Sequence, residues 1–233
     1  ACATVQVPSA MNPNWTALTS AGVEGPPAMG AAITLGKSMA RVCAMFGFFR
    51  RKRTPQLQAD WLVVGLGNPG AKYAATRHNV GYMALDELAG GLQPVPGIKA
   101  RVQVRDGVAY ARSTTYMNTT GEAVGPLAKQ LGVAPDHIIV IHDELDLPAG
   151  TMRVKLGGNE NGHNGLKSIT EHLGTRDYLR VRIGIGRPPK GVTVPDWVLG
   201  PVEGEVPVGT AAQAVRLLIT DGLQKAQNVI HAR

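Results

Sequence analysis

The sequence has 233 residues, of which 44% are hydrophobic and 5% aromatic, a length and composition that fit one domain with a buried aliphatic core. The formal net charge is +7, but residues 1–59 hold six Lys and Arg against one acid, which leaves 18 basic and 16 acidic residues in the rest, so the net charge alone does not indicate nucleic-acid binding by the folded part. Both cysteines, Cys2 and Cys43, also lie in residues 1–59 and no apolar run is long enough to span a bilayer, which excludes a disulfide framework and a Cys-based metal site in residues 60–233 and disfavours a membrane helix.

Residues 1–59 are rich in Pro, Ala, Ser and Thr and show no sustained hydrophobic period. This composition predicts a disordered basic extension, followed by a single catalytic domain over residues 60–233. The segment does not begin with Met, and translation from an internal start such as Met45 is the favoured interpretation. An organelle transit peptide is the alternative, because acid-poor N-termini containing Arg and Ser have that composition.

The first regular elements follow at once. Residues 61–66 form a short apolar run typical of a strand that is buried on both faces, and residues 67–70 end it as a turn. Thr76 can cap a helix whose apolar positions recur at helical spacing until Gly90-Gly91.

The next elements are a hairpin and two helices around a buried strand. Residues 101–105 and 108–112 flank Asp106-Gly107, a strong signal for a two-residue hairpin turn. The remaining predictions, in chain order, are a helix after Asn118 that stops at Gly132, a strand over 137–141, a helix over 162–173, a strand over 179–186 and a helix over 209–229. Strands and helices alternate with short connections, so we expect an α/β fold: one twisted, mixed but mainly parallel sheet flanked by helices.

His78 and Asp143 are the strongest candidates for catalysis. His78 falls in the first turn of a predicted helix, and Asp143 comes at the end of a predicted strand, where open α/β sheets bind ligands. A carboxylate that fixes the tautomer of a histidine makes it a suitable general base near neutral pH. His142-Asp143 at a strand end does not suit a helical metal phosphohydrolase motif, and no further ligand at zinc-site spacing is evident. Neither a Gly-x-Ser-x-Gly elbow nor a cysteine is available for covalent catalysis, which leaves activation of water by histidine and aspartate.

The glycine-rich stretch Gly65–Gly70 matches a dinucleotide-binding fingerprint. In such a site a helix starts inside the motif and its amides hold the pyrophosphate. Here Pro69 and residues 70–75 delay the helix to about residue 77. The glycines are better explained as a tight loop that presents Asn68, although a purely structural turn and a nucleotide-binding oxidoreductase remain open at this point.

Asn118 and Asn164 each lie at a boundary between a loop and a helix. An Asn in such a place is most often a cap. Several amides that converge on one pocket would instead suit a substrate rich in carbonyl and hydroxyl groups, and would stabilise an oxyanion.

Taken in order, these motifs resemble bacterial-type peptidyl-tRNA hydrolase over about three quarters of the chain. The motifs that carry the resemblance are Gly65-Leu66-Gly67-Asn68-Pro69-Gly70, Tyr73, Thr76-Arg77-His78-Asn79-Val80-Gly81, Met117-Asn118, His142-Asp143-Glu144-Leu145-Asp146, Gly162-His163-Asn164-Gly165-Leu166-Lys167 and Arg182-Ile183-Gly184-Ile185-Gly186. The resemblance implies an enzyme that hydrolyses the ester between a peptide and tRNA, without metal or other cofactor, as a cytoplasmic monomer. A non-catalytic RNA-binding relative is the rival interpretation, and retention of His78 and Asp143 disfavours it.

The resemblance also implies a role for individual residues. His78 matches the catalytic base and Asp143 the group that orients it. Asn68, Asn118 and Asn164 match amides that hold the substrate. Tyr73 and Met117 match residues that form pocket walls. Lys155 and Arg182 match a basic pair that binds the tRNA 5′-phosphate.

Two segments depart from the family pattern. Residues 157–162 contain Glu160, a carboxylate that we expect to weaken RNA binding slightly. Residues 187–196 stand where the family has a mobile lid, but they are short and contain Pro188-Pro189 and Pro195, which disfavours lid motion.

Overall fold

The computed structural model describes residues 57–232, and seven strands of this part form one sheet. The strands are β1 (Trp61–Gly65), β2 (Gln93–Pro94), β3 (Ala100–Arg105), β4 (Val108–Ser113), β5 (Ile138–Glu144), β6 (Met152–Leu156) and β7 (Leu179–Gly184). Their order is β2-β3-β4-β1-β5-β7-β6. The four central strands β4, β1, β5 and β7 run parallel, and the strands outside them pair antiparallel. The predicted α/β class with a mixed sheet is confirmed, and its parallel part is the centre.

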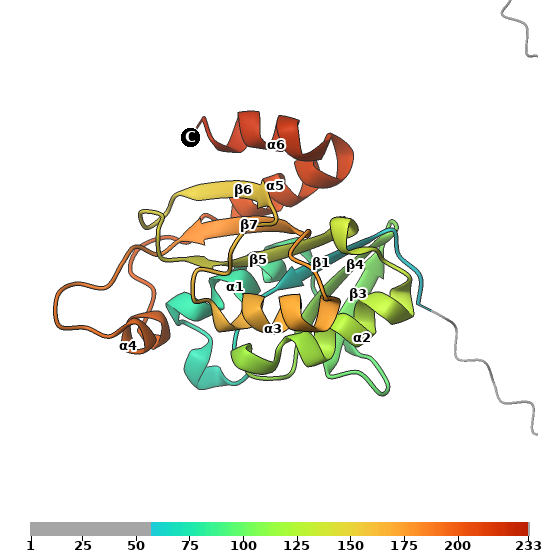
Figure 1. The fold of residues 1–233 in the computed structure, drawn as a ribbon, viewed down its shortest axis with the longest axis horizontal. Helices are drawn as coiled ribbons and strands as arrows, with labels where there is room; N and C mark the ends of the chain where they lie inside the picture. Colours follow the sequence, from blue (N-terminus) through green and yellow to red (C-terminus); the bar gives the residue numbers. More distant parts are fainter. Residues whose placement is uncertain (1–56, 233) are drawn as a thin grey trace, which may run out of the picture. The chain divides into compact units, whose positions relative to one another are not determined.

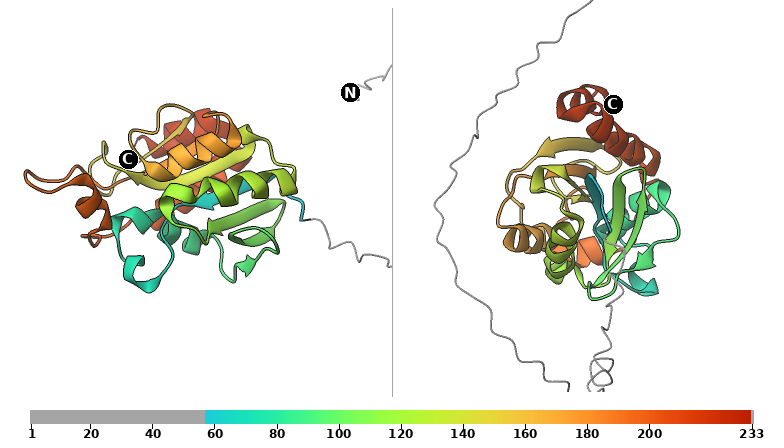
Figure 2. Two further views of the ribbon diagram at one scale, coloured as in Figure 1. Left: turned by 60° about the horizontal axis from the view of Figure 1, so that its bottom comes forward. Right: turned by 90° about the vertical axis from the view of Figure 1, so that its right-hand side faces the viewer.

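Helices cover both faces of the sheet (Figures 1 and 2). They are α1 (Val80–Leu88), α2 (Gly121–Leu131), α3 (Asn164–Leu173), α4 (Val194–Leu199), α5 (Val208–Thr220) and α6 (Gly222–Ile230). Helices α2 and α3 pack on one face against Leu62, Val64 and Val140, which belong to one core cluster. Helices α1 and α5 pack on the opposite face. The alternation of side chains along each strand therefore divides the buried residues into two hydrophobic clusters.

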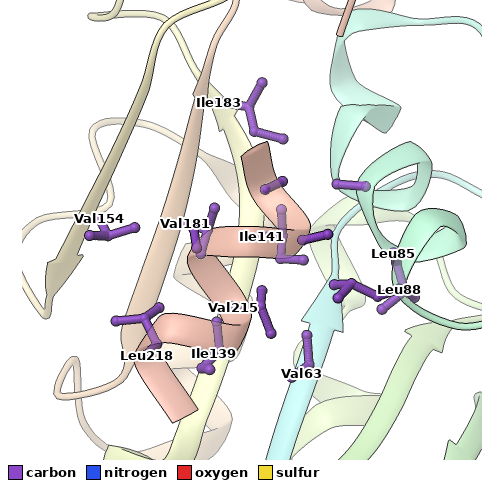
Figure 3. Close-up of a cluster of buried hydrophobic side chains, with 14 of the residues drawn as sticks. Val63, Leu85, Leu88, Ile139, Ile141, Val154, Val181, Ile183, Val215 and Leu218 are labelled. Carbon is purple, nitrogen blue, oxygen red and sulfur yellow. The ribbon is translucent and has the colours of Figure 1, made fainter. Parts of the chain in front are cut away.

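The cluster on the α1 and α5 face is drawn in Figure 3. The strand residues Ile139, Ile141 and Val181 pack there against Val215 of α5. All four side chains are fully excluded from solvent. Burial of aliphatic side chains on this scale is the main stabilising contribution to a domain of this size, and it makes the sheet a rigid platform for whatever lies at its edge.

Helix α1 begins almost in contact with the sheet because two glycines face each other. A Cβ atom on Gly65 would lie 2.4 Å from the carbonyl oxygen of Gly81, and one on Gly81 would lie 2.4 Å from that of Ile141. Only a residue without a side chain permits this approach. The residues just before α1 are thereby placed directly over the ends of β1 and β5.

The C-terminal segment corrects one prediction. The single helix expected over 209–229 is two helices, α5 and α6, that meet at Asp221 and Gly222. Gly222 has a positive φ of 80°, a conformation that ends a helix and turns the chain. Helix α6 then lies along the edge strand β6, where the Val154 N–H donates to Nε2 of His231 at 3.0 Å and Gln227 donates to the Val154 carbonyl at 3.2 Å.

Most other predicted elements are present. The Asp106-Gly107 turn has positive φ at both residues, as a type I′ hairpin requires. Helix α2 ends at the left-handed Gly132. The short strands β2 and β6 and helix α4 were not predicted. No helix within residues 57–232 combines the length and the apolar character needed to cross a membrane. Residues 1–56 of the extension predicted over 1–59 lie outside the part of the chain that the structure describes.

Candidate active site

Five chain segments, including the one with α4 that follows β7, meet at the carboxyl edge of the parallel strands and line a pocket of about 720 Å³. Because parallel strands all end at the same edge, the segments that follow β1, β4 and β5 come together there with the start of α3. The pocket is lined by Asn68, His78, Tyr116, Met117, Asn118, His142, Asp143, Glu144, Leu145, Asp146, Glu160, Asn161, Gly162, His163, Asn164, Arg187, Val194, Pro195, Val198 and Leu199. Six of the nine residues proposed from the sequence are in this set.

Asp143 is the centre of the site. It lies within β5, one residue before the strand ends at Glu144, and its side chain is only 2% exposed. Nδ1 of His78 lies 2.9 and 3.0 Å from the two carboxylate oxygens, and Nε2 of His163 lies 2.9 Å from Oδ1. The structure thus brings His78 and Asp143 together and adds His163, which the sequence did not indicate as a partner of Asp143.

The hydrogen bonds of His163 determine which of its ring nitrogens carries the proton. Its Nδ1 accepts from the backbone N–H of Gly165 at 3.1 Å and of Leu166 at 3.4 Å, and so caps the N-terminus of α3. Nδ1 must therefore be unprotonated, and Nε2 is the N–H that donates to Asp143. The carboxylate of Asp143 can only accept, so His78 donates to it through Nδ1, and in the neutral imidazole Nε2 carries the lone pair beside the pocket.

The pKa of Asp143 reflects this arrangement. Burial on its own raises the pKa of the carboxyl group, but the nearby His163 and His78 and their two hydrogen bonds lower it far more, and the net pKa lies well below its usual range. The aspartate is consequently ionised at neutral pH, and its negative charge lies within hydrogen-bonding distance of both imidazoles.

His78, Asp143 and His163 also carry donor atoms of the kind that bind metals. One donor atom from each of His78, Asp143 and His163 lies within 4.8 Å of the others, so a third potential ligand exists that the sequence spacing did not reveal. A cation at Nε2 of His163 would have to displace the proton there, while Nδ1 is committed to the cap of α3. The donor set therefore fits a carboxylate that orients two histidines, and it does not fit a metal.

Asn68 is held by a second network, whose organiser is Asn79. The Asn68 N–H donates to Oδ1 of Asn79 at 2.8 Å, and Nδ2 of Asn79 donates back to the Asn68 carbonyl at 2.9 Å. Oδ1 of Asn68 accepts from the Met117 N–H at 2.8 Å. This last bond fixes the orientation of the amide, so that Nδ2 of Asn68 is left to donate to a bound molecule. Asn79 was not singled out from the sequence, although it adjoins His78.

Of the other residues proposed for the pocket, three line it and one does not. Met117 is buried, whereas Asn118 and Asn164 are exposed, and all three line the pocket. Tyr73 does not line it. The ring of Tyr73 instead packs edge-on against Tyr116, with centroids 6.3 Å apart, and Tyr116 is the aromatic residue that reaches the pocket.

The proposed phosphate-binding pair lies on neighbouring strands outside the pocket. Lys155 is on β6 opposite Arg180, and Arg182 is two residues further along β7. Nε of Arg182 donates to the buried carboxylate of Glu144 at 2.9 Å. Burial and the positive charges of Arg182 and Arg180 lower the pKa of Lys155, which places these cations close enough to repel one another.

Glu160 does not present a free carboxylate. It accepts from Nε of Arg176 at 2.7 Å, and this hydrogen bond is the main reason why its pKa falls to about 2. Arg180 holds the same loop from the other side by donating to the carbonyls of Gly158 and Asn159. The expected weakening of RNA binding by Glu160 stays a prediction, and Arg176 reduces the charge that would cause it.

The glycine-rich stretch Gly65–Gly70 does not open a helix. A 3-10 turn at Ala71–Tyr73 follows it, and α1 begins only at Val80. The amides of a helix N-terminus, which would hold a pyrophosphate, are therefore not at the motif. Gly65 and Gly67 permit the close approach of α1, since a Cβ on them would lie 2.4 Å from Gly81 and 2.7 Å from the Tyr82 ring, whereas Gly70 supplies a positive φ of 106° for the turn.

Comparison with known proteins gives consistent results. The family model for peptidyl-tRNA hydrolase matches residues 62–233. The chain is 61% identical over 187 residues to peptidyl-tRNA hydrolase 2 of Corynebacterium glutamicum, a match that covers 77% of this chain and 92% of that protein. It is 43% identical over 231 residues to peptidyl-tRNA hydrolase 2 of Corynebacterium jeikeium, covering 82% and 96%.

Solved structures show the same likeness. The crystal structure of peptidyl-tRNA hydrolase from Acinetobacter baumannii matches with a TM-score of 0.66 and 34% identity, covering 77% of this chain and 98% of that one. A crystal structure of a peptidyl-tRNA hydrolase in complex with N-propanol matches with a TM-score of 0.65 and 36% identity, covering 74% and 94%. Sequence and fold thus lead to the same family.

Proposed function

This chain belongs to the peptidyl-tRNA hydrolase family and hydrolyses the ester between peptide and tRNA, and we propose that it does so with a water molecule activated by His78 and Asp143. One observation carries this proposal. Nδ1 of His78 lies 2.9 Å from Oδ1 of the buried Asp143, whose pKa is held well below its usual range, so that the neutral imidazole presents the lone pair of Nε2 beside the pocket.

The steps follow from that arrangement. Nε2 of His78 removes a proton from a water molecule as the water oxygen attacks the ester carbonyl carbon. Asp143 stabilises the imidazolium that forms, and the tetrahedral intermediate carries the negative charge on the former carbonyl oxygen. When the intermediate collapses, His78 returns the proton to the ribose oxygen, which leaves as the free hydroxyl of tRNA. No covalent bond to the enzyme is formed at any stage.

Side-chain amides would stabilise the oxyanion and hold the substrate. Nδ2 of Asn68 is the best-placed donor, because Asn79 and the Met117 N–H fix the whole residue. We assign Asn118 and Asn164 to the same role from the pocket walls. Donors that are fixed before the reaction stabilise developing charge without reorganising. In many hydrolases this is the largest contribution to the rate enhancement.

Replacing His78 tests the base directly. We expect His78→Ala to lower kcat by a factor on the order of 10³ or more, while the Kd for tRNA changes little, because the base acts on the water rather than on the RNA. Turnover of peptidyl-tRNA with EDTA present is the measurement. His137→Ala is a matched control, since His137 forms a similar pair with Asp136 at an exposed position. Full activity of His78→Ala would exclude it as the base.

Lys155 and Arg182 are proposed to bind the 5′-phosphate of tRNA. A terminal phosphate carries more charge than a bridging one, so two neighbouring cations can distinguish it. Lys155→Ala should weaken binding and lower the slope of log K against log salt by about one. The comparison uses tRNA with a 5′-phosphate or a 5′-hydroxyl, and Lys129→Ala on α2 is the control. Equal loss of affinity for both RNAs would contradict the assignment.

We further propose that the enzyme acts in the cytoplasm as a monomer, with an organelle as the minor alternative if residues 1–59 are a transit peptide. Family membership supports this assignment. Light scattering of the purified chain tests the monomer, and N-terminal sequencing of the native protein tests whether residues 1–59 are retained.

A further inference from the structure

Arg77, the residue before His78, is buried in a way that catalysis as described does not explain. Its side chain is 7% exposed, although arginine is among the residues least often buried. The guanidinium carbon lies 3.5 Å from the ring centroid of Trp197 in α4, and Nη1 donates to the Trp197 carbonyl at 3.2 Å. Its partner Glu203 is 80% exposed, so that ion pair contributes little. The main contact of Arg77 is with helix α4.

The backbone around Arg77 makes the same connection. Its N–H donates to the carbonyl of Gly200 at 3.0 Å, and the Val202 N–H donates to the carbonyl of Ala75 at 2.9 Å. Thr76 and Pro201 form an isolated antiparallel bridge between these bonds. The segment at 75–77 and the segment at 200–202 are therefore joined as a short two-stranded ladder.

Helix α4 is one wall of the pocket. Val194, Pro195, Val198 and Leu199 face the cavity. In Figure 1 and in the left-hand view of Figure 2, α4 lies beside the turn that precedes α1. Residues 187–193 directly precede α4 in the chain, form no regular structure and are mostly exposed. The wall is thus tied to the segment at 75–77 by its C-terminal end. At its other end, Nε1 of Trp197 donates to the carbonyl of Gly186 at 2.9 Å, and Arg187 pairs with Asp146.

We propose that Arg77 is a positioning residue that couples this wall to the catalytic base. Because Arg77 and His78 are consecutive in one 3-10 turn (Arg77–Asn79), α4 cannot move away from the pocket without pulling on the residue next to His78. Displacement of the wall and misalignment of the base with Asp143 are then one event. This inference rests on the proposed role of His78, and it assigns no contact between Arg77 and the substrate.

Two variants test the coupling from opposite sides. Arg77→Met keeps an unbranched stem that resembles the aliphatic part of arginine but removes the charge and the planar stacking group. Gly200→Ala leaves Arg77 in place, but its Cβ would lie 2.7 Å from Nη1 of Arg77, while the φ of −72° at Gly200 suits alanine. Gly209→Ala is the matched control, because no atom lies within 4 Å of the added carbon.

We expect both variants to lower kcat/KM about tenfold or more, as a displaced catalytic group does, and Gly209→Ala to leave it unchanged. Two readouts separate positioning from general destabilisation. Hydrogen exchange of the α4 amides should accelerate, and the NMR signal of the Nδ1–H of His78, which the hydrogen bond to Asp143 protects, should broaden or disappear. Arg77→Lys should show the same faster exchange in α4 and the same change in the His78 signal, since Lys cannot stack on Trp197 as a planar group.

Three results would overturn the coupling. The first is faster exchange in α4 with an unchanged His78 signal and unchanged kcat/KM, which would make wall and base independent. The second is a loss of activity without any change in α4. The third is a Gly200→Ala enzyme, correctly folded, that behaves as wild type in all readouts. Failure of the proposed base would appear differently, as turnover by His78→Ala, and the exchange and NMR readouts do not depend on turnover.

Discussion

Asp143 accepts hydrogen bonds from two histidines at once, and this has a consequence for its replacement. In an asparagine the NH₂ group replaces either Oδ2, 3.0 Å from Nδ1 of His78, or Oδ1, 2.9 Å from both histidines. In either orientation the Nδ1–H of His78 would face a second donor. The cap of α3 fixes the tautomer of His163. His78 is therefore the ring whose tautomer must change. The wrong tautomer of His78 would place a proton on Nε2, where the base is needed.

We therefore expect Asp143→Asn to lower kcat by a factor on the order of 10³ to 10⁴ with little effect on KM, as in other hydrolases where an aspartate holds the tautomer of a histidine. Single-turnover cleavage of peptidyl-tRNA measures the chemical step. Asp136→Asn, beside the exposed His137, should retain wild-type activity. A loss smaller than tenfold for Asp143→Asn would show that the tautomer of His78 is held by other groups.

The contribution of His163 to the site could not be predicted from sequence. Asp143 and His163 are separated by strand β6 and a glycine-rich loop whose path depends on Arg176 and Arg180, contacts that no local pattern reveals. His78 and Asp143 could be predicted because each stands at the end of a regular element. Asn79 was missed for a different reason, since its partner Asn68 is eleven residues away across a turn of irregular geometry.

At the scale of elements, the seating of α1 on the sheet decides where His78 lies. The contact is made by Gly81, whose hypothetical Cβ would lie 2.4 Å from the Ile141 carbonyl oxygen and 2.6 Å from the Leu66 backbone. Backbone atoms of two central strands cannot move aside cheaply. The whole helix would have to rise, and the turn with His78 would rise with it.

Gly81→Ala should accordingly lower the free energy of unfolding by about 2 to 3 kcal/mol and remove most turnover even in the fraction that folds. Urea unfolding followed by circular dichroism gives the first quantity, and kcat normalised to folded protein gives the second. Gly90→Ala is the control, since nothing lies within 4 Å of the added carbon, and it should stay within about 0.5 kcal/mol of wild type. Equal stability of the two variants would contradict the close packing of α1.

The elements themselves differ in how far local sequence predicts them. Strand β1, the hairpin of β3 and β4, and helix α2 are delimited by apolar runs, an Asp-Gly turn and Gly132, all local signals. The break between α5 and α6 was missed because the apolar spacing continues across Asp221 and Gly222. Strand β6 was missed because only five residues form it, and its pairing with β7 decides its structure.

At the scale of the whole molecule, the attachment of α6 depends on a neutral histidine. Nε2 of His231 accepts from the Val154 N–H, which requires it to be unprotonated. Burial, followed by repulsion from Arg153, lowers the pKa of His231 below its ordinary value of 6.5. Because the folded pKa is lower than the unfolded one, this contact is fully stabilising above about pH 6.5 and is lost as the pH falls below it.

Hydrogen exchange of the Val154 amide and of α6 should therefore accelerate between pH 7.5 and pH 5.5, after correction for the intrinsic pH dependence of exchange. His231→Gln provides an acceptor that does not titrate, so its corrected exchange should not vary with pH. Amides of the buried β5 serve as an internal reference in both proteins. The same acceleration in His231→Gln would show that another group is responsible.

The position of α6 also bears on the behaviour of the protein at high concentration. Strand β6 is the last strand of the sheet, and an open edge of this kind offers unpaired N–H and C=O groups to the backbone of another molecule. Gln227 and His231 occupy both polar groups of Val154, near the middle of that edge. The C-terminal segment thus occupies part of the edge at which another molecule could pair, and we expect a chain shortened before Gln227 to aggregate more readily.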